Sequence, residues 1–454
     1  MSENIIENAS AINYFNEEAE KLLGLLVEMK ETEIKKSPLK SVQEEVLLAI
    51  DESEVEYSFK AQIDYYGNET ARYFQVSADK WLGIDGDNYQ EIRKLSANLY
   101  KKREINDRIG KETLIKIFFD WMKTKCVSTQ GEPLSFVEYL NKSIQKIENV
   151  KISIPIINME IDLEFEVGKV RFEYMKKELF DEIDAKMKEK VVSKELPENE
   201  YTEFVSKLRK DHQGKVVGTI HVKAETEKAI EIAEKEVDRA IVALKYFSPF
   251  AFVPRAAAIF GRKGMTWIPS REIFVFTDTL PTIHQGLVGN QSILFKIDGV
   301  LLAKLKAAGL AKLSELILKS DLSEFEELIF TALYTFSKAI SQIDFHERLI
   351  FILSALEIVF LKDSGEPIQI HVGQRLGFLT SPEPDKRRET VLLVSDGYKI
   401  RSNYIHHGQE NENYEILSKL QRACWNALSI MINNHNKFKN KQEFMSYIEK
   451  LIYS

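Results

Sequence analysis

The chain has 454 residues, of which 44% are hydrophobic and 29% are charged, and its formal net charge is −8. This composition is typical of a soluble globular protein, and the length exceeds that of one ordinary core, so we expect two or three domains. The acidic charge argues against a broad, non-specific nucleic-acid binder, which is usually basic, but allows contact with nucleic acid at a local basic site.

Residues 1–149 are expected to form a mixed α/β domain. Residues 9–30 favour a helix. Apolar residues alternate over residues 55–65 and predict a strand, which turns at Gly67 and returns as a partner strand over residues 72–76. Two helices are expected to follow, over residues 112–125 and 134–148.

Residues 150–319 are expected to form an α+β domain. Short strands are predicted over residues 151–156, 159–166, 169–174 and 215–223. A helix is predicted over residues 226–246, where apolar residues recur at helical spacing. A β-rich piece around 257–277 and a helical stretch over 293–318 are expected next, and the charged residues 186–194 form either a helix end or a flexible link.

Residues 320–454 show only helical patterns separated by short polar breaks. An apolar helix covers residues 345–360, and a proline-containing link at 381–388 leads to another helix that carries Arg401. The last long helix is expected over residues 414–432, with apolar residues three and four positions apart. The overall expectation is therefore an α+β chain that ends in an all-α helical bundle.

The segment Tyr398-Lys-Ile-Arg-Ser-Asn-Tyr-Ile-His-His-Gly408 carries the most informative chemistry. The guanidinium of Arg401 can hold a phosphate with its planar set of donors, and the imidazole of His406 or His407 can move a proton near neutral pH. These groups are sufficient for cutting RNA without a metal. Positions five apart lie about 140° apart around a helix, so geometry alone does not choose between the histidines. Gly408 is expected to end the helix.

The order of these elements resembles the HEPN superfamily, and most closely its ApeA-like branch. The matching pieces are Ser354-Ala-Leu-Glu357, Gln374-Arg-Leu-Gly-Phe-Leu379 and the Tyr398 to Gly408 segment, which together cover about the last 135 residues. The strands near Ile154 and Phe165 are also similar to the region that precedes this domain in ApeA-like proteins.

The resemblance implies a dimeric helical module that acts as a metal-independent endoribonuclease in antiphage defence, in abortive infection or as a toxin. Its target would be RNA, for which tRNA is one candidate, and a phage-derived trigger or a regulatory partner would control it. The family pattern makes Arg401 and His406 the catalytic pair, shared across a homodimer interface. Other members keep the fold without the chemistry, so a non-catalytic interaction or scaffold module is the alternative.

Further residues near the motif have two interpretations each. Glu357 stands in an apolar stretch and either orients Arg401 or a histidine, or lies on a polar stripe that faces solvent. Asn403 and Tyr404 either bind phosphate or a base, or are surface or interface residues. His407 either assists His406 or occupies a polar surface. Tyr398 is expected to pack rather than to take part in chemistry.

Basic side chains close to the motif are candidates for RNA contact. They are Lys386, Arg387 and Arg388 before the motif helix, and Lys437, Lys439 and Lys441 near the C-terminus. The alternative is that they are solvated helix ends.

No other cofactor or metal chemistry is indicated by the sequence. We find no phosphate-binding loop, no nucleotide-cofactor motif and no zinc-protease pair of histidines after His346, so no cofactor or metal is expected. Cys126 and Cys424 are too few for a disulfide framework. The N-terminus lacks a signal-peptide pattern and the longest apolar run is too short to cross a bilayer, so a cytoplasmic location is expected.

Overall fold

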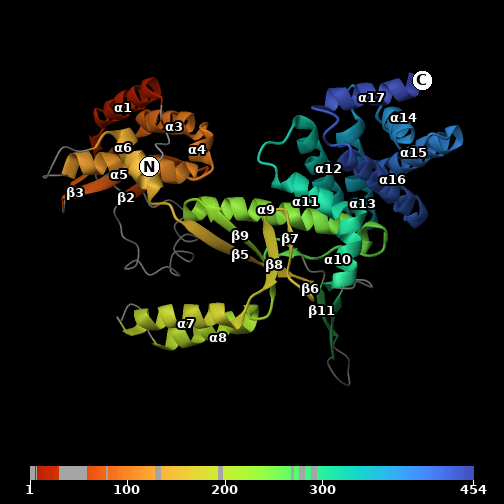
Figure 1. Cartoon of the computed structure of the whole chain (residues 1–454), viewed down its shortest axis with the longest axis horizontal. Coiled ribbons are helices and arrows are strands. Elements are labelled where there is room, and N and C mark those ends of the chain that lie inside the picture. The colour runs from red at the N-terminus through yellow and green to blue at the C-terminus, as the bar shows by residue number, and fades with distance from the viewer. Residues whose placement is uncertain are drawn as a thin grey trace. The chain divides into compact units, whose positions relative to one another are not determined.

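The computed structural model describes residues 6, 8–29, 59–77, 80–127, 134–192, 198–266, 270–275, 282–287, 294–363 and 365–453. The described chain is α+β, as expected, and it divides into two compact units (Figure 1). Unit 1 comprises Met1–Val150 and His221–Glu231, and unit 2 comprises Lys151–Ile220 and Ile232–Ser454. The expected domain boundary after residue 149 nearly coincides with the end of the first segment of unit 1 at Val150. The expected boundary after residue 319 falls inside unit 2.

Unit 1 combines an antiparallel sheet with five described helices. The sheet has the strand order β1-β4-β3-β2. Its strands are β1 (Val27–Glu28), β2 (Phe59–Ile63), β3 (Glu69–Ser77) and β4 (Lys80–Asp85). The helices are α1 (Ala9–Leu23), α3 (Gly86–Tyr100), α4 (Arg103–Asn106), α5 (Lys111–Val127) and α6 (Phe136–Gln145).

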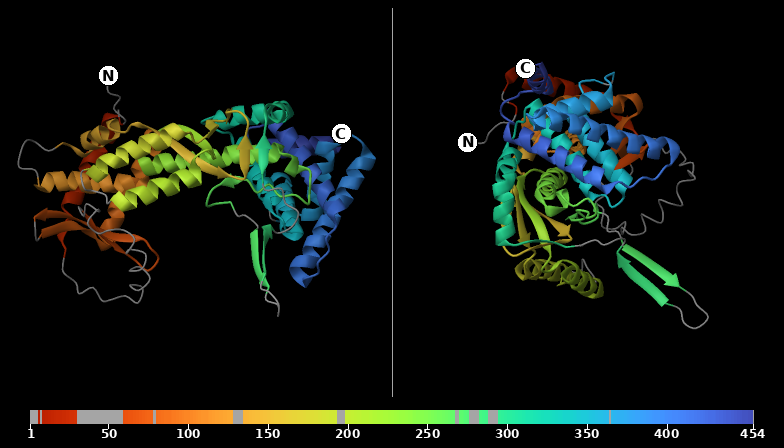
Figure 2. Two further views of the ribbon diagram at one scale, coloured as in Figure 1. Left: turned by 90° about the horizontal axis from the view of Figure 1, so that it is seen from below. Right: turned by 90° about the vertical axis from the view of Figure 1, so that its right-hand side faces the viewer.

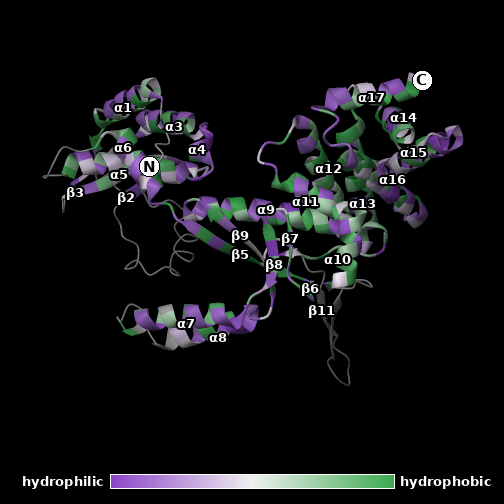
Figure 3. Ribbon diagram, viewed as in Figure 1, coloured by the Kyte–Doolittle hydropathy of each residue, from purple (hydrophilic) through white to green (hydrophobic). Residues whose placement is uncertain are grey.

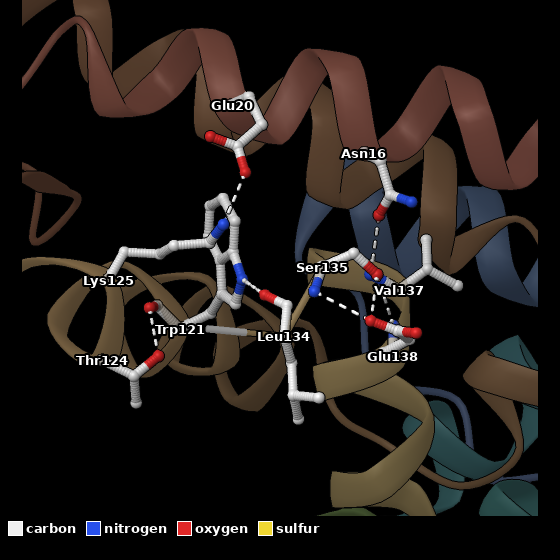
Figure 4. Close-up of polar contacts among 9 residues, drawn as sticks. All are labelled: Asn16, Glu20, Trp121, Thr124, Lys125, Leu134, Ser135, Val137 and Glu138. Atoms are coloured by element: carbon white, nitrogen blue, oxygen red, sulfur yellow. Dashed lines mark hydrogen bonds and ion pairs between the residues drawn. The ribbon is translucent and has the colours of Figure 1, made fainter. Parts of the chain in front are cut away.

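The ends of these helices are held by specific polar contacts (Figure 4). Ser135 and Glu138 form a capping box at the start of α6. Asn16 of α1 accepts a hydrogen bond from the Val137 backbone at 2.9 Å, and Trp121 of α5 donates its indole N–H to the Leu134 carbonyl at 3.0 Å. Helices α1, α5 and α6 are thereby joined around the stacked rings of Phe118 and Phe136, whose centroids are 4.0 Å apart.

Unit 1 corrects several sequence expectations. The expected helix over residues 9–30 ends at Leu23, and residues 27–28 form strand β1 instead. The expected strand over 55–65 is described only as Phe59–Ile63, since residues 55–58 lie outside the described part. Strand β4 and helices α3 and α4 were not expected. The strand over 72–76 and the helices over 112–125 and 134–148 are confirmed within a few residues.

The β-rich part of unit 2 is a five-stranded sheet with the order β10-β5-β9-β8-β7. Its strands are β5 (Asn149–Ile157), β7 (Phe165–Val167), β8 (Val170–Tyr174), β9 (Val216–Lys223) and β10 (Gly261–Arg262). Helix α9 (Thr226–Phe247) packs on β9 at Gly218, where a Cβ atom would stand 3.2 Å from a methyl group of Val237. Strand β6 (Met159–Ile161) pairs in parallel with β13 (Phe295–Ile297).

Two hairpins extend from this sheet region (Figures 1 and 2). Helices α7 (Lys177–Val192) and α8 (Glu198–His212) lie side by side between β8 and β9, and neither was expected. Strands β11 (Ser270–Val275) and β12 (Thr282–Leu287) form an antiparallel β-hairpin. The charged residues 186–194 belong to α7 as far as Val192, and residues 193–194 lie outside the described part.

The helical part of unit 2 begins after β13. It contains α10 (Gly299–Leu305), the π-helix η2 (Lys306–Leu310), α11 (Ala311–Leu318), α12 (Glu324–Ser341), α13 (Phe345–Phe360), α14 (Ile368–Thr380), α15 (Pro384–His407), α16 (Tyr414–Asn433) and α17 (Lys441–Tyr453). Figure 3 shows mainly hydrophobic residues along α11, α12 and α13. The expected helices of this region are confirmed, but the stretch over 293–318 opens with a strand rather than a helix.

One hydrophobic core runs through the sheet and the helices of unit 2. It extends from Ile156 of β5 to Ile448 of α17. The guanidinium of Arg348 on α13 is buried and binds the backbone carbonyls of Pro254, Ala256 and Ile340. The segment that follows α9 is therefore fastened directly to the helical part, which explains why the two expected regions form one unit.

An ion pair between the buried Arg375 of α14 and the partly exposed Glu366 fixes the start of that helix. Arg375 binds both carboxylate oxygens of Glu366, at 2.6 and 2.7 Å, and also donates to the Phe360 carbonyl at 2.6 Å. The hydrogen bonds from Arg375 lower the pKa of Glu366 from its ordinary value of 4.5 to about 2. The ionised carboxylate therefore stabilises the fold above pH 4.5, and this contribution is lost as the pH falls towards 2.

We predict that Glu366→Gln lowers the free energy of unfolding by about 3 kcal/mol at pH 7, because the buried guanidinium loses its counter-ion. The deficit relative to wild type should shrink between pH 4.5 and 2. Urea unfolding at several pH values measures both effects. Glu383→Gln, which removes the exposed partner of Lys386, is the control and should change stability little. A Glu366→Gln deficit that is equal at pH 7 and pH 2.5 would contradict the assignment.

Candidate functional site

The candidate site is built on α13 and α15, which pack against each other in unit 2. Glu357 of α13 accepts two hydrogen bonds on one oxygen, from the Tyr398 hydroxyl at 2.9 Å and from Nη1 of Arg401 at 3.0 Å. The side chains of Arg401 and Glu357 are 28% and 22% exposed. Glu357 therefore contacts Arg401, one of the two partners that the sequence suggested for it.

The surroundings of Glu357, Tyr398 and Arg401 determine the protonation of the Tyr398 hydroxyl. Burial and the neighbouring Glu357 carboxylate raise the pKa of Tyr398, so its hydroxyl stays protonated and donates. Removing the Glu357 carboxylate from water on an otherwise apolar helix costs free energy. The hydrogen bonds from Tyr398 and Arg401 offset this cost. Tyr398 thus has a polar role in addition to the packing role that the sequence suggested.

Arg401 keeps donors that this contact does not use. Its Nε is buried and has no hydrogen-bond partner among the described residues, and its bond to Glu357 uses Nη1 alone. A buried donor without a partner is uncommon in folded proteins. The buried Nε is out of reach of a ligand, but the side chain is 28% exposed and bonds to Glu357 through Nη1 alone. The guanidinium can therefore bind an anionic oxygen while Glu357 continues to hold it.

The two histidines stand at the end of α15. His406 and His407 are both exposed, and their ring centroids are 6.5 Å apart. Gly408 ends the helix in a left-handed conformation with φ 61°, as the sequence suggested. The backbone N–H groups of Gly408 and Gln409 bind the carbonyls of Tyr404 and Asn403. This closure gives the last turn a defined end.

A buried histidine of α13 supports the same turn. The ring of His346 stacks on Tyr404 with a centroid distance of 4.0 Å and an angle of 8°. Nε2 of His346 accepts a hydrogen bond from the backbone N–H of Asn411 at 3.4 Å. Sequence reasoning tested His346 only as a zinc ligand and missed this role, because no sequence pattern pairs it with Tyr404.

Tyr404 is therefore a packing residue of the last turn, whereas the side chain of Asn403 is partly exposed. Direct contacts bring together Glu357, Tyr398 and Arg401 in one group, and His346 and Tyr404 in another. His406 and His407 follow Tyr404 closely along the chain, and both side chains face solvent.

The first set of basic candidates lies far from the histidines. Lys386 and Arg388 stand near the start of α15, about 30 Å along the helix axis from His406. Lys386 pairs with Glu383 at 2.8 Å, and Arg387 donates to the Ser381 carbonyl and covers the ring of Phe378. These residues cannot hold the phosphate that the histidines of the same helix would contact.

The second set of basic candidates consists of one partly buried lysine and two exposed lysines. Lys441 is partly buried and donates to the Ile358 carbonyl at 2.7 Å, next to Glu357 on α13, and burial lowers the pKa of its ammonium group. Lys437 and Lys439 are exposed in the loop between α16 and α17. Lys441 is thus a structural contact, and the loop lysines remain free to meet a ligand.

The described ranges contain no group of three or more His, Cys, Asp or Glu side chains that could hold a metal ion. No helix in them is long and apolar enough to cross a membrane.

We predict that His346→Ala loosens the last turn of α15, because Tyr404 loses its stacking partner and Asn411 its acceptor. Backbone hydrogen exchange of residues 404–413 should become faster. His346→Phe is the matched variant, since it keeps a ring for Tyr404 but no acceptor. It should accelerate exchange mainly at Asn411. Unchanged exchange in both variants would show that the contact does not hold this turn.

The chain has no match among protein-family models, curated proteins or solved structures.

Proposed function

We propose that the protein is a metal-independent endoribonuclease whose helical part is a HEPN-type domain. The observation that carries the proposal is the placement of Arg401. Its guanidinium is held by Glu357, retains unused donors and belongs to the same helix end as two exposed histidines. This combination supplies one group for phosphate charge and one for proton transfer.

In the proposed reaction, an imidazole of His406 accepts the proton of a ribose 2′-hydroxyl. The 2′-oxygen attacks the adjacent phosphorus, and the bond from phosphorus to the 5′-oxygen breaks. A protonated imidazole gives its proton to that leaving oxygen, while Arg401 stabilises the negative charge on the phosphate. The products are a 2′,3′-cyclic phosphate and a 5′-hydroxyl.

A homodimer would supply both proton-transfer groups. Arg401 and His406 lie about 140° apart around α15, so one helix does not direct both at a single phosphate from the same face. Two copies of α15 facing each other across a two-fold axis provide an arginine and a histidine from opposite sides. Action in antiphage defence or abortive infection, with tRNA as one target, is part of the same proposal.

A non-catalytic interaction module is the second candidate. It is favoured by the pairing of Arg401 with Glu357, since a guanidinium that already has a carboxylate partner can serve structure alone. It is also favoured by the acidic net charge of −8. The two candidates differ in whether Arg401 and His406 are needed for RNA cleavage.

We predict that Arg401→Ala and His406→Ala each lower the rate of RNA cleavage by about 100-fold or more, because each removes a group needed in the transition state. Cleavage by wild type should persist in EDTA. Lys399→Ala is the matched control, since it removes an exposed cation from the same helix. His407→Ala tests which histidine transfers the proton. Cleavage by Arg401→Ala at the wild-type rate would reject the proposal.

We further predict that a single 2′-deoxy substitution at the cleaved linkage abolishes cleavage, because the nucleophile is absent. Mass spectrometry of the products should find 2′,3′-cyclic phosphate ends. Deoxy substitution one nucleotide away is the control and should be tolerated. Products that end in a 5′-phosphate would contradict this mechanism.

A further inference from the structure

A second feature of unit 2 has the chemistry of a nucleotide-binding site. A hollow of about 590 Å³ lies between the loop after α16 and helix α17. Its lining supplies two cations (Lys437 and Lys450), two aromatic rings (Phe438 and Tyr447) and two amides (Asn440 and Gln442). Cations beside an exposed ring are the combination by which proteins hold a phosphate and a base together.

The aromatic part of the hollow is rigid. Tyr447 is 43% exposed, and its ring rests against Phe438 with a centroid distance of 5.4 Å. Phe438 is in turn packed edge-on against the buried Phe325 of α12, at 5.2 Å. The ring of Tyr447 is therefore supported by the tilted ring of Phe438 and remains partly exposed, so it can offer a surface to a base.

The charges of the hollow favour an anion. Lys437 and Lys450 are exposed, and no ion pair joins either of them to a carboxylate within the described ranges. The carboxylate of Glu443, which also lines the hollow, accepts the backbone N–H of Lys439 at 2.8 Å. Glu443 keeps its negative charge, so two lysines and one carboxylate leave the lining with a net charge of +1, which favours a phosphate.

The loop is anchored on both sides, so the hollow exists before a ligand arrives. His435 bonds to Glu326 at 2.8 Å, and the Lys439 carbonyl accepts the backbone N–H of Phe325 at 3.1 Å. Burial alone would raise the pKa of Glu326, but hydrogen bonds from Lys319, the Ser323 backbone and His435 lower it to about 2. Glu326 therefore remains a charged anchor at neutral pH.

The same hollow is attached to the helix that carries Glu357. Lys441 at the start of α17 binds the carbonyl of Ile358, and Lys362 just after α13 pairs with Glu449. These two contacts tie α17 to the end of α13, the helix whose Glu357 holds Arg401 of α15.

We propose that this hollow binds one nucleotide of a single-stranded RNA substrate, away from the cleaved linkage. The base stacks on Tyr447, and the flanking phosphates lie against Lys437 and Lys450. The choice of RNA rests on the proposed function, whereas the hollow and its chemistry do not. Because stacking accepts any base, the site contributes affinity rather than sequence preference.

The test measures binding of a fluorescent 12-nucleotide single-stranded RNA to the full chain carrying Arg401→Ala. Adding Tyr447→Ala should raise the Kd by about 5- to 100-fold, which is the usual range for the loss of one stacked base. Tyr447→Phe should keep the affinity. Tyr453→Ala, which removes an 87% exposed ring from the end of the same helix, is the matched control and should leave the Kd unchanged.

The lysines are tested by the salt dependence of the same Kd. Replacing Lys437 and Lys450 with Gln should reduce the slope of log K against log salt by about 1.4, since each phosphate contact contributes about 0.7 for a single strand. Thermal melting confirms that each variant is folded. An unchanged Kd in Tyr447→Ala, an unchanged slope in the lysine variant, or a uridine monophosphate that binds as tightly as the 12-mer would each overturn the proposal.

The two proposals fail in different ways. If wild type cleaves RNA but Tyr447→Ala changes neither the Kd nor the KM, the hollow is not an RNA site and the nuclease proposal stands. If no RNA is cleaved but Tyr447→Ala still weakens binding, the hollow is an RNA site and the nuclease proposal falls.

Discussion

The candidate site depends on one constraint. The Glu357 carboxylate lies on an apolar helix, so hydrogen-bond donors must replace the water that it loses. Tyr398 and Arg401 provide that compensation by sharing one oxygen of Glu357. The contact restricts a long, flexible side chain before any ligand arrives, so less conformational entropy is lost on binding. It also lowers the net positive charge that a phosphate would meet. An arginine tolerates this competition because its five donors can serve two anions at once.

The end of α15 shows how packing determines which side chains are available. The stack of Tyr404 on His346 fixes the rotation of the last turn, and the left-handed Gly408 stops the helix directly after His407. Tyr404 is thereby used for packing, and the neighbouring histidines are turned to solvent. A single copy therefore presents an arginine embedded at a helix contact and a histidine outside it. The need for a second copy in the proposed reaction follows from this separation.

The helical part could be predicted from the sequence because its signals are local. The apolar spacing of α16 and the glycine after His407 each give an element or its end directly. The missed contacts are tertiary. Nothing in the sequence shows that Arg348 binds carbonyls of residues 254–256, or that His346 meets Tyr404, because these partners are 58 or more residues apart. The charged helices α7 and α8 were missed although α8 carries a helical apolar pattern, with Tyr201, Phe204, Val205 and Leu208 three and four residues apart.

Short-range electrostatics reconciles the acidic charge of the chain with the proposed RNA ligand. At physiological salt a charge is screened beyond about 8 Å, so the distribution of unpaired cations matters more than the net charge of −8. The basic segment that is most conspicuous in the sequence, around Lys386, is partly used by Glu383 and the Ser381 carbonyl. Lys437 and Lys450 are far less conspicuous, yet they lie beside an exposed ring at a preformed hollow. Ion pairing within the fold thus decides which basic residues can attract a phosphate.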